Sequence, residues 1–129
     1  MIHNPAPPNR LADRLCTLAG WLDFHEALPV GSIGLTNSGA YSVVYVDSSD
    51  DVQAWANVLH AEVDRTEDLG AVPFVEYRTR GFVDAAKEYV VGVVFADMQE
   101  GRELADRAEA ARLDREAARA MTTDAETAA

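Results

Sequence analysis

Lysine and cysteine are the scarcest side chains of this sequence, and their shortage excludes whole classes of protein. Lys87 is the only lysine, Cys16 is the only cysteine, and there are only eight glycines and five prolines in 129 residues. A single cysteine excludes an intramolecular disulfide scaffold, and so little glycine and proline excludes a collagen-like or low-complexity chain. With 48 % hydrophobic residues, the sequence predicts one globular domain with a single core.

Long apolar runs are also missing. Nowhere do eighteen apolar residues occur together, and the first residues, MIHNPAPPN, lack a positive region followed by an apolar stretch. We therefore expect neither secretion nor insertion into a membrane. Cys16 lies within an apolar helical pattern, which predicts a buried, reduced thiol and a cytoplasmic protein.

Positive charge is scarce as well. Eleven Lys and Arg stand against 22 Asp and Glu, a net charge of -11 that disfavours direct binding of DNA or RNA. The acidity is concentrated in residues 40–70, whereas the charges of residues 71–96 cancel. One hypothesis is an acidic decoy that occupies the nucleic-acid groove of a host protein, although the pattern favours solubility and helix capping. The candidate interaction residues in this acidic segment are Glu62, Asp64, Glu67 and Asp68.

The N-terminal third predicts a helix and a short strand. After a lead-in over residues 1–8, Asn9 is the expected N-cap of a helix over residues 10–27, which Pro29 ends. A strand follows around residues 32–36, with a turn at residues 37–39. The helix presents one leucine face, made of Leu11, Leu15, Leu18 and Leu22.

The middle of the chain predicts an inner strand and the clearest helix. Residues 41–46 are rich in β-formers and apolar on both faces, as in a strand inside a sheet. Hydroxyl and carboxylate side chains at residues 47–51 suit the N-terminus of a helix that starts near residue 49. We expect Trp55 and Leu59 to be buried against the sheet, at the centre of an apolar sector formed by Val52, Trp55, Ala56, Leu59 and Val63.

Two more strands and a long helix are expected after a polar turn at residues 65–70. Residues 73–80 begin with a proline, which predicts a strand near the sheet edge, and residues 83–87 connect it to an inner strand over residues 89–95. From Met98 the chain becomes rich in Ala, Glu and Arg, which predicts a helix to residue 121 and a frayed tail over 122–129. Oppositely charged pairs four residues apart, such as Arg112 with Glu116, would support that helix.

These elements predict an α+β fold in the order α-β-β-α-β-β-α. We expect a single domain over residues 9–97 with a mainly antiparallel four-stranded sheet, helices packed on it, and the C-terminal helix beyond.

On the last strand, Val90 and Val94 face away from Val91 and Val93, so both faces of the sheet need cover. We therefore predict a homodimer that buries the second face, with docking of the last helix as the monomeric alternative.

Catalytic and metal-binding patterns are weak. His60 and Glu62 are two residues apart and diverge on a helix, and the pair His25 and Glu26 has no further ligand at suitable spacing. Ser48 and Ser49 are better explained as helix caps than as nucleophiles. Residues 30–39 contain small residues but lack the lysine of a phosphate-binding loop. We therefore predict no catalytic, cofactor or metal site.

One basic and aromatic patch lies on the third strand and the connection after it. Aromatic rings with arginines can stack on single-stranded bases, but Glu76, Asp84 and Glu88 interleave the segment and cancel its charge. An ordinary ladder of opposite charges across strands is the simpler interpretation. The patch consists of Tyr77, Arg78, Arg80, Phe82 and Lys87, of which Tyr77, Arg78 and Arg80 are candidate interaction residues.

Two segments carry a family resemblance. Residues 22–30, LDFHEALPV, and residues 52–59, VQAWANVL, resemble small uncharacterised α+β proteins of actinobacteria and their phages or integrated elements. The resemblance implies an accessory protein of a phage or mobile element and no chemistry. The expected function is a non-enzymatic protein interaction or regulation; the alternatives are the acidic decoy, or a small-molecule binder or enzyme using a cleft beside the first hairpin.

Overall fold

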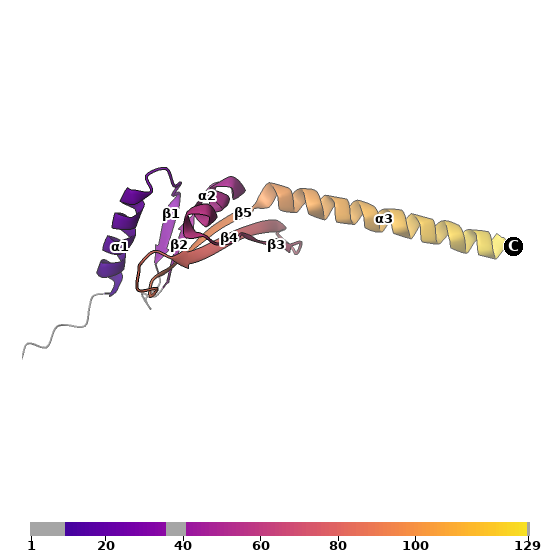
Figure 1. Ribbon diagram of the computed structural model, residues 1–129. Coiled ribbons are helices and arrows are strands. Elements are labelled where there is room, and N and C mark those ends of the chain that lie inside the picture. Colours follow the sequence, from indigo (N-terminus) through magenta and orange to yellow (C-terminus); the bar gives the residue numbers. More distant parts are fainter. Residues whose placement is uncertain (1–9, 36–40, 129) are drawn as a thin grey trace, which may run out of the picture. The chain divides into compact units, whose positions relative to one another are not determined.

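The computed structural model describes residues 10–35 and 41–128, and it confirms the α+β class. Asn9, the lead-in and the turn at residues 37–39 lie outside the described residues. Figure 1 labels the elements in chain order: α1 (Arg10–Phe24), β1 (Ser32–Leu35), β2 (Tyr41–Tyr45), α2 (Ser49–Leu59), β3 (Asp64–Asp68), β4 (Phe74–Phe82), β5 (Val90–Asp97) and α3 (Met98–Ala128).

The chain divides into two compact units. The first, the sheet unit, contains the chain up to Thr66 together with Glu76–Ala96. The second, the arm unit, contains Glu67–Val75 together with the chain from Asp97 onward. The change of composition at Met98 therefore lies near one boundary of the arm unit, which also includes the segment that leads into β4.

The strands form one mixed sheet in the order β1-β2-β5-β4-β3. β1 pairs with β2 in antiparallel orientation, but β2 pairs with β5 in parallel orientation. The predicted four-stranded, mainly antiparallel sheet is therefore wrong in strand number and in this central pairing. The expected interior position of the β2 segment is confirmed, because β2 lies between β1 and β5.

Two differences from the sequence prediction concern the far edge of the sheet. The polar segment expected to be a turn forms β3, a strand that is exposed at every residue and lies at the edge. Charged residues are tolerated there because an edge strand needs no apolar face and charge protects the edge from further pairing. β4 is consequently not an edge strand, and Pro73 is accommodated because it precedes the first strand residue, Phe74.

Helix α2 has the predicted start. The Ser48 hydroxyl accepts a hydrogen bond from the Asp51 N–H at 3.1 Å, and the helix ends at His60, which adopts a left-handed conformation with φ of 52°. Trp55 is fully buried as predicted, but Leu59 is only half-buried. Leu59 lies in the last helical turn, where it packs against the rim of the core cluster and beside Gly81, whose added Cβ atom would lie 3.0 Å from the Leu59 Cβ.

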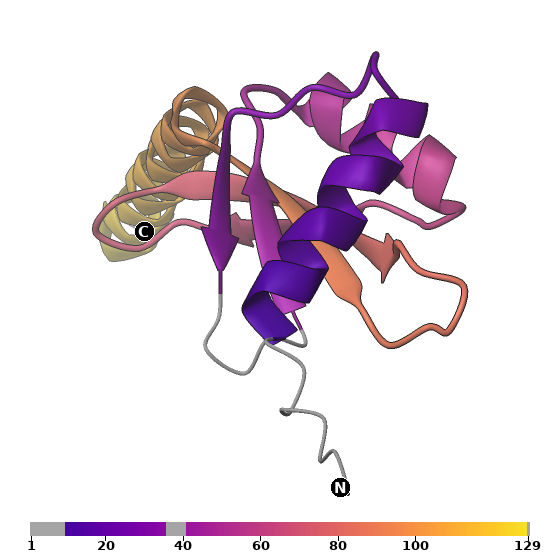
Figure 2. The same cartoon turned by 90° about the vertical axis from the view of Figure 1, so that its left-hand side faces the viewer.

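Helix α1 is shorter and more exposed than the leucine pattern predicts. It crosses β2 and β5 (Figure 2), and Leu18 is buried in the core cluster that includes Val44 and Val91. Leu11 and Leu15 are 43 % and 39 % exposed, so only the later part of the leucine face is covered.

Cys16 is exposed, so the predicted buried thiol is wrong. The reason is angular: two residues turn a helix by about 200°, which points Cys16 away from Leu18.

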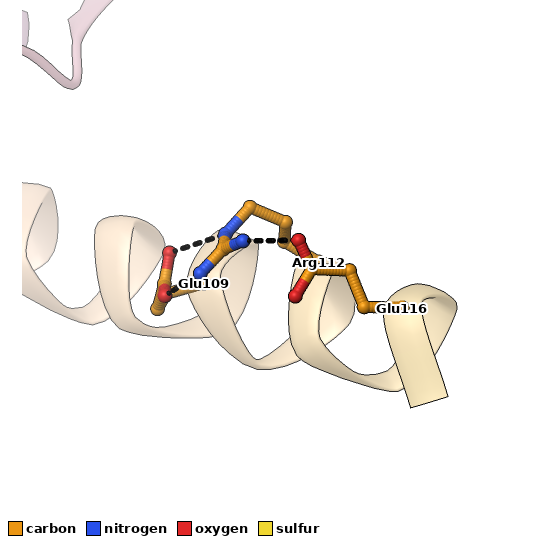
Figure 3. Close-up of polar contacts among 3 residues, drawn as sticks. All are labelled: Glu109, Arg112 and Glu116. Atoms are coloured by element: carbon orange, nitrogen blue, oxygen red, sulfur yellow. Dashed lines mark hydrogen bonds and ion pairs between the residues drawn. The ribbon is translucent and has the colours of Figure 1, made fainter. Parts of the chain in front are cut away.

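Helix α3 is stabilised locally. The Asp97 carboxylate caps its N-terminus by accepting from the Glu100 N–H at 2.9 Å, and the backbone is helical to Ala128, beyond the expected end at residue 121. Figure 3 shows Arg112 between two carboxylates, at 2.6 Å from Glu116 as expected and also bonded to Glu109. The hydrogen bond from Arg112 holds the pKa of Glu109 below its ordinary value. Such pairs add helix stability in water without a tertiary partner.

A buried hydroxyl pair joins β2 to the start of β5. The Ser42 and Tyr89 hydroxyls share a hydrogen bond of 2.7 Å, and both residues are almost fully buried. We expect Tyr89→Phe to cost about 1 to 3 kcal/mol of unfolding free energy, because the Ser42 hydroxyl loses its partner. The double variant Tyr89→Phe with Ser42→Ala should recover part of that loss in urea denaturation. Strictly additive losses would show that the two hydroxyls do not stabilise each other.

Candidate functional site

The register of the sheet gives it two chemically different faces. Ser42 and Val44 of β2 and Val91 and Val93 of β5 are buried, and the three valines belong to the core cluster with residues of α1 and α2. The alternate residues therefore point to the opposite face, and the register aligns Tyr41 with Val90 and Tyr45 with Val94. We call this second surface the outer face; it contains Tyr41, Val43, Tyr45, Val90, Val94 and Ala96.

Two glycines bring tyrosine rings of the outer face down onto the strands. A Cβ atom at Gly92 would lie 2.4 Å from the Tyr41 hydroxyl oxygen, and one at Gly34 would lie 3.3 Å from the Tyr45 ring. Each ring therefore covers a position that has no side chain of its own, as aromatic residues beside strand glycines do. Since the Tyr45 side chain is already held in place yet 48 % exposed, a partner could bury it with little loss of conformational entropy.

A hollow of about 510 Å³ lies on this face. Its apolar lining includes Val43, Tyr45 and Val94, while Asp47, Glu76 and Arg78 supply its charges. The Arg78 guanidinium lies 2.9 Å from the Glu76 carboxylate, and about half of the arginine side chain is exposed. An ion pair of that exposure contributes little stability, so Arg78 can leave Glu76 and pair with a carboxylate of a partner instead.

The structure separates the predicted basic and aromatic patch into two surfaces. Tyr77 lies toward the core, stacked on Phe95 at 6.5 Å between ring centroids, with the Arg65 guanidinium 6.0 Å from its ring. Because side chains alternate between the two faces of a strand, Arg78 and Arg80 point to the opposite side from Tyr77, which is the side of the outer face. The candidate residues Tyr77 and Arg78 therefore do not form one continuous stacking surface for bases.

The four acidic candidates are exposed but do not belong to one unit. Glu62 and Asp64 lie in the sheet unit, and Glu67 and Asp68 lie in the arm unit. The Glu62 carbonyl oxygen accepts a hydrogen bond from the Thr79 hydroxyl at 2.9 Å, and the Asp68 carboxylate accepts from the Gly70 N–H at 3.0 Å. Their carboxylates lie on or next to the edge strand β3, a position where charge limits strand pairing.

The outer face also includes residues that the sequence analysis missed. Val90 and Val94 were candidates because of the two-sided apolar pattern of their strand, but Tyr41, Val43 and Tyr45 were not. Alternation within Tyr41–Tyr45 would have placed these three side chains together on one face. Their meeting with Val90 and Val94 depends on the parallel β2–β5 pairing, which no local pattern specifies.

His25 and His60 have structural surroundings. His25 packs against Trp21 with ring centroids 4.4 Å apart, and His60 is the exposed residue that ends α2. Among the side chains that the structure describes, no group of three His, Cys, Asp or Glu is placed to bind a metal ion. In the same part of the chain, no helix combines the length and the apolar character needed to cross a membrane.

Comparisons with known proteins give the chain no relative: no family model, no curated protein and no solved structure matches it. The outer face, with its exposed tyrosine, its apolar side chains and its balanced charges, is therefore the basis for proposing a function.

Proposed function

We propose that this chain is a non-enzymatic interaction protein that associates with a second copy of itself through the outer face. The observation that carries the proposal is the side-chain composition of that face, where apolar residues surround the half-exposed Tyr45 and the accessible Arg78. Tyrosine and arginine are enriched among the residues that dominate binding energy at protein interfaces.

The local charge of the outer face is compatible with a second copy as the partner. The chain carries a net charge of -11, so two copies repel each other over most of their surface. On the outer face and its border, the carboxylates of Asp47 and Glu76 are balanced by Arg78 and Arg80. Two such faces can meet without accumulating charge, and Arg78 of each copy can pair with a carboxylate of the other.

The size of the face indicates a weak dimer. The four strands β1, β2, β5 and β4 have four to nine residues each, and at about 3.3 Å per residue and about 4.8 Å between strands they present roughly 400 Å² on each copy. The total of about 800 Å² lies below the usual range for stable protein interfaces. We therefore expect a dimer that forms and dissociates with concentration rather than a permanent one.

Sedimentation equilibrium over a range of protein concentrations tests this proposal. We expect a monomer–dimer equilibrium for the natural chain and a monomer for Tyr45→Glu, because that substitution places a charge in the centre of the interface. Tyr45 is 48 % exposed and lies outside the core cluster, so the variant should keep the far-UV circular dichroism of the natural chain even though its ring no longer covers Gly34.

Leu113→Glu is the matched control, since Leu113 is 51 % exposed on α3. Dimerisation that survives Leu113→Glu and is lost in Tyr45→Glu supports the outer face. The opposite result would place the association on α3, and a natural chain that stays monomeric at millimolar concentration would exclude the dimer. Saturable binding of a small molecule at the hollow beside β2 would favour the alternative of a small-molecule binder.

The biological setting that we propose is a cytoplasmic accessory protein of an actinobacterial phage or mobile element. It rests on the resemblance of residues 22–30 and 52–59 to such proteins. The position of the gene tests it: we expect phage or integrase genes on either side, and a conserved housekeeping operon would contradict the proposal.

A further inference from the structure

A second hollow, of about 460 Å³, lies at the end of α1 and against α2. It shares no lining residue with the hollow of the outer face. The end of α1 and the turn after it contribute one side, and the exposed surface of α2 contributes the other. Its lining residues are Phe24, His25, Glu26, Ala27, Leu28, Ala54, Asn57 and Val58.

Phe24 is the most unusual side chain of this site. It is 89 % exposed, more than any other large hydrophobic side chain in the described part of the chain. It stands beside a lining that is mostly apolar, including Leu28, Ala54 and Val58. A ligand that covered Phe24 and these side chains would remove a connected apolar surface from water, which favours binding.

The electrostatics of the hollow favour a cationic ligand. Helix α1 ends at Phe24 and has no basic residue in its last turn, so the partial negative charge of its C-terminal carbonyl groups is not offset by a cation. Asp23 is exposed at the same helix end, and Glu26 is the only acidic or basic residue, histidine apart, in the lining. The faces of the Phe24 ring also attract cations.

We propose that this hollow binds an amphipathic helical segment of a basic protein partner. An apolar side chain of the segment enters between Phe24 and Val58, and a lysine or arginine one turn away lies over the Phe24 ring near the Glu26 carboxylate. Charge complementarity with a chain of net charge -11 selects such a partner over an acidic one. This site is separate from the outer face, so it does not depend on self-association.

A synthetic 18-residue amphipathic peptide of leucine and lysine is the probe, and the same peptide with glutamate in place of lysine is its negative control. Binding to the full chain is followed by calorimetry and by tryptophan fluorescence, since Trp21 packs against His25 of the lining. We expect saturable one-to-one binding of the lysine peptide only. Phe24→Ala should weaken it about tenfold, as loss of an aromatic anchor does, and Glu26→Gln should reduce its salt dependence.

Matched variants separate this site from general attraction to an acidic protein. Phe82 is 47 % exposed and outside the hollow, so Phe82→Ala should leave the affinity unchanged. Glu62→Gln removes one exposed carboxylate elsewhere and should also have no effect. Equal affinities for the natural chain and for Phe24→Ala would overturn the proposal, and so would equal losses in Phe24→Ala and Phe82→Ala. Because Phe24 is almost fully exposed, its variant should retain the native circular dichroism spectrum.

Discussion

Trp55→Ala is expected to destabilise the sheet unit more than any other single truncation in its core. Trp55 is fully buried, its indole N–H donates to the Pro29 carbonyl oxygen at 2.7 Å, and its ring stacks on Trp21 with centroids 5.4 Å apart. Truncation removes the ring, leaves a cavity and deprives a carbonyl of its donor. Such changes cost about 3 to 5 kcal/mol, which is most of the stability of a domain at the lower end of the usual range.

Urea denaturation followed by circular dichroism measures the loss. Trp55→Phe is the informative companion, because it retains an aromatic ring but removes the indole N–H, and we expect an intermediate cost of about 1 to 3 kcal/mol. Trp21→Phe should cost less than Trp55→Phe, since Trp21 is only half-buried whereas Trp55 is fully buried. A stability of Trp55→Ala within 1 kcal/mol of the natural chain would contradict the central position of this side chain.

The sequence predicts α2 well because every signal for this helix is local. The Ser48 cap, the acidic first turn and the apolar positions around Trp55 act within one continuous segment, and the structure shows each of them. The error at Leu59 arises where the helix ends: its side chain packs against the core cluster as its direction predicts, but it is only half-buried there. Burial at a helix end depends on the neighbouring elements, which periodicity does not describe.

The sheet could be predicted only in part, because pairing is a long-range property. The inner strands were found from their two-sided apolar composition, and the position of β2 inside the sheet is confirmed. β3 was missed because its charged residues have no apolar alternation, and the parallel β2–β5 pairing was missed because a mainly antiparallel sheet was predicted from the order of the strands. Strands that follow each other in the sequence suggest antiparallel hairpins. A parallel pair instead joins strands that are far apart in the sequence through a crossover connection, and the local pattern of a strand does not indicate which distant strand it pairs with.

The candidate surfaces were less predictable than the fold. The alternation of Val90 and Val94 indicated that a second sheet face needs cover, but Tyr45 joins that face only through the register with Val94. The exposure of Phe24 was not foreseen either, because α1 ends at this residue instead of continuing to residue 27. Because the helix ends three residues earlier than predicted, the residues that were expected to continue it line a hollow instead.

Gly101→Ala is expected to disrupt the arm unit, although alanine is the better helix former. Gly101 is buried in the first turns of α3, and a Cβ atom there would lie 2.3 Å from Cα and 2.4 Å from N of Phe74, and 2.6 Å from C of Pro73. These are backbone atoms, so no side-chain rotation relieves the overlap. We expect the free energy of unfolding of the arm unit to fall by about 1 to 3 kcal/mol, because α3 can no longer approach Pro73 and the first residue of β4 so closely, as in other overpacked sites.

Gly20→Ala is the matched control, since Gly20 also lies within a helix but has no atom within 4 Å of the added Cβ. Helix propensity alone favours alanine at both positions by about 1 kcal/mol, so Gly20→Ala should raise the melting temperature while Gly101→Ala lowers it.

Amide hydrogen exchange locates the effect: the N–H groups of Phe74, Val75 and the first turns of α3 should exchange about 10- to 100-fold faster in Gly101→Ala. The fluorescence of Trp55, which is buried in the sheet unit, should not change. If Gly101→Ala instead gains stability as Gly20→Ala does, the close approach of α3 to Phe74 does not exist in solution.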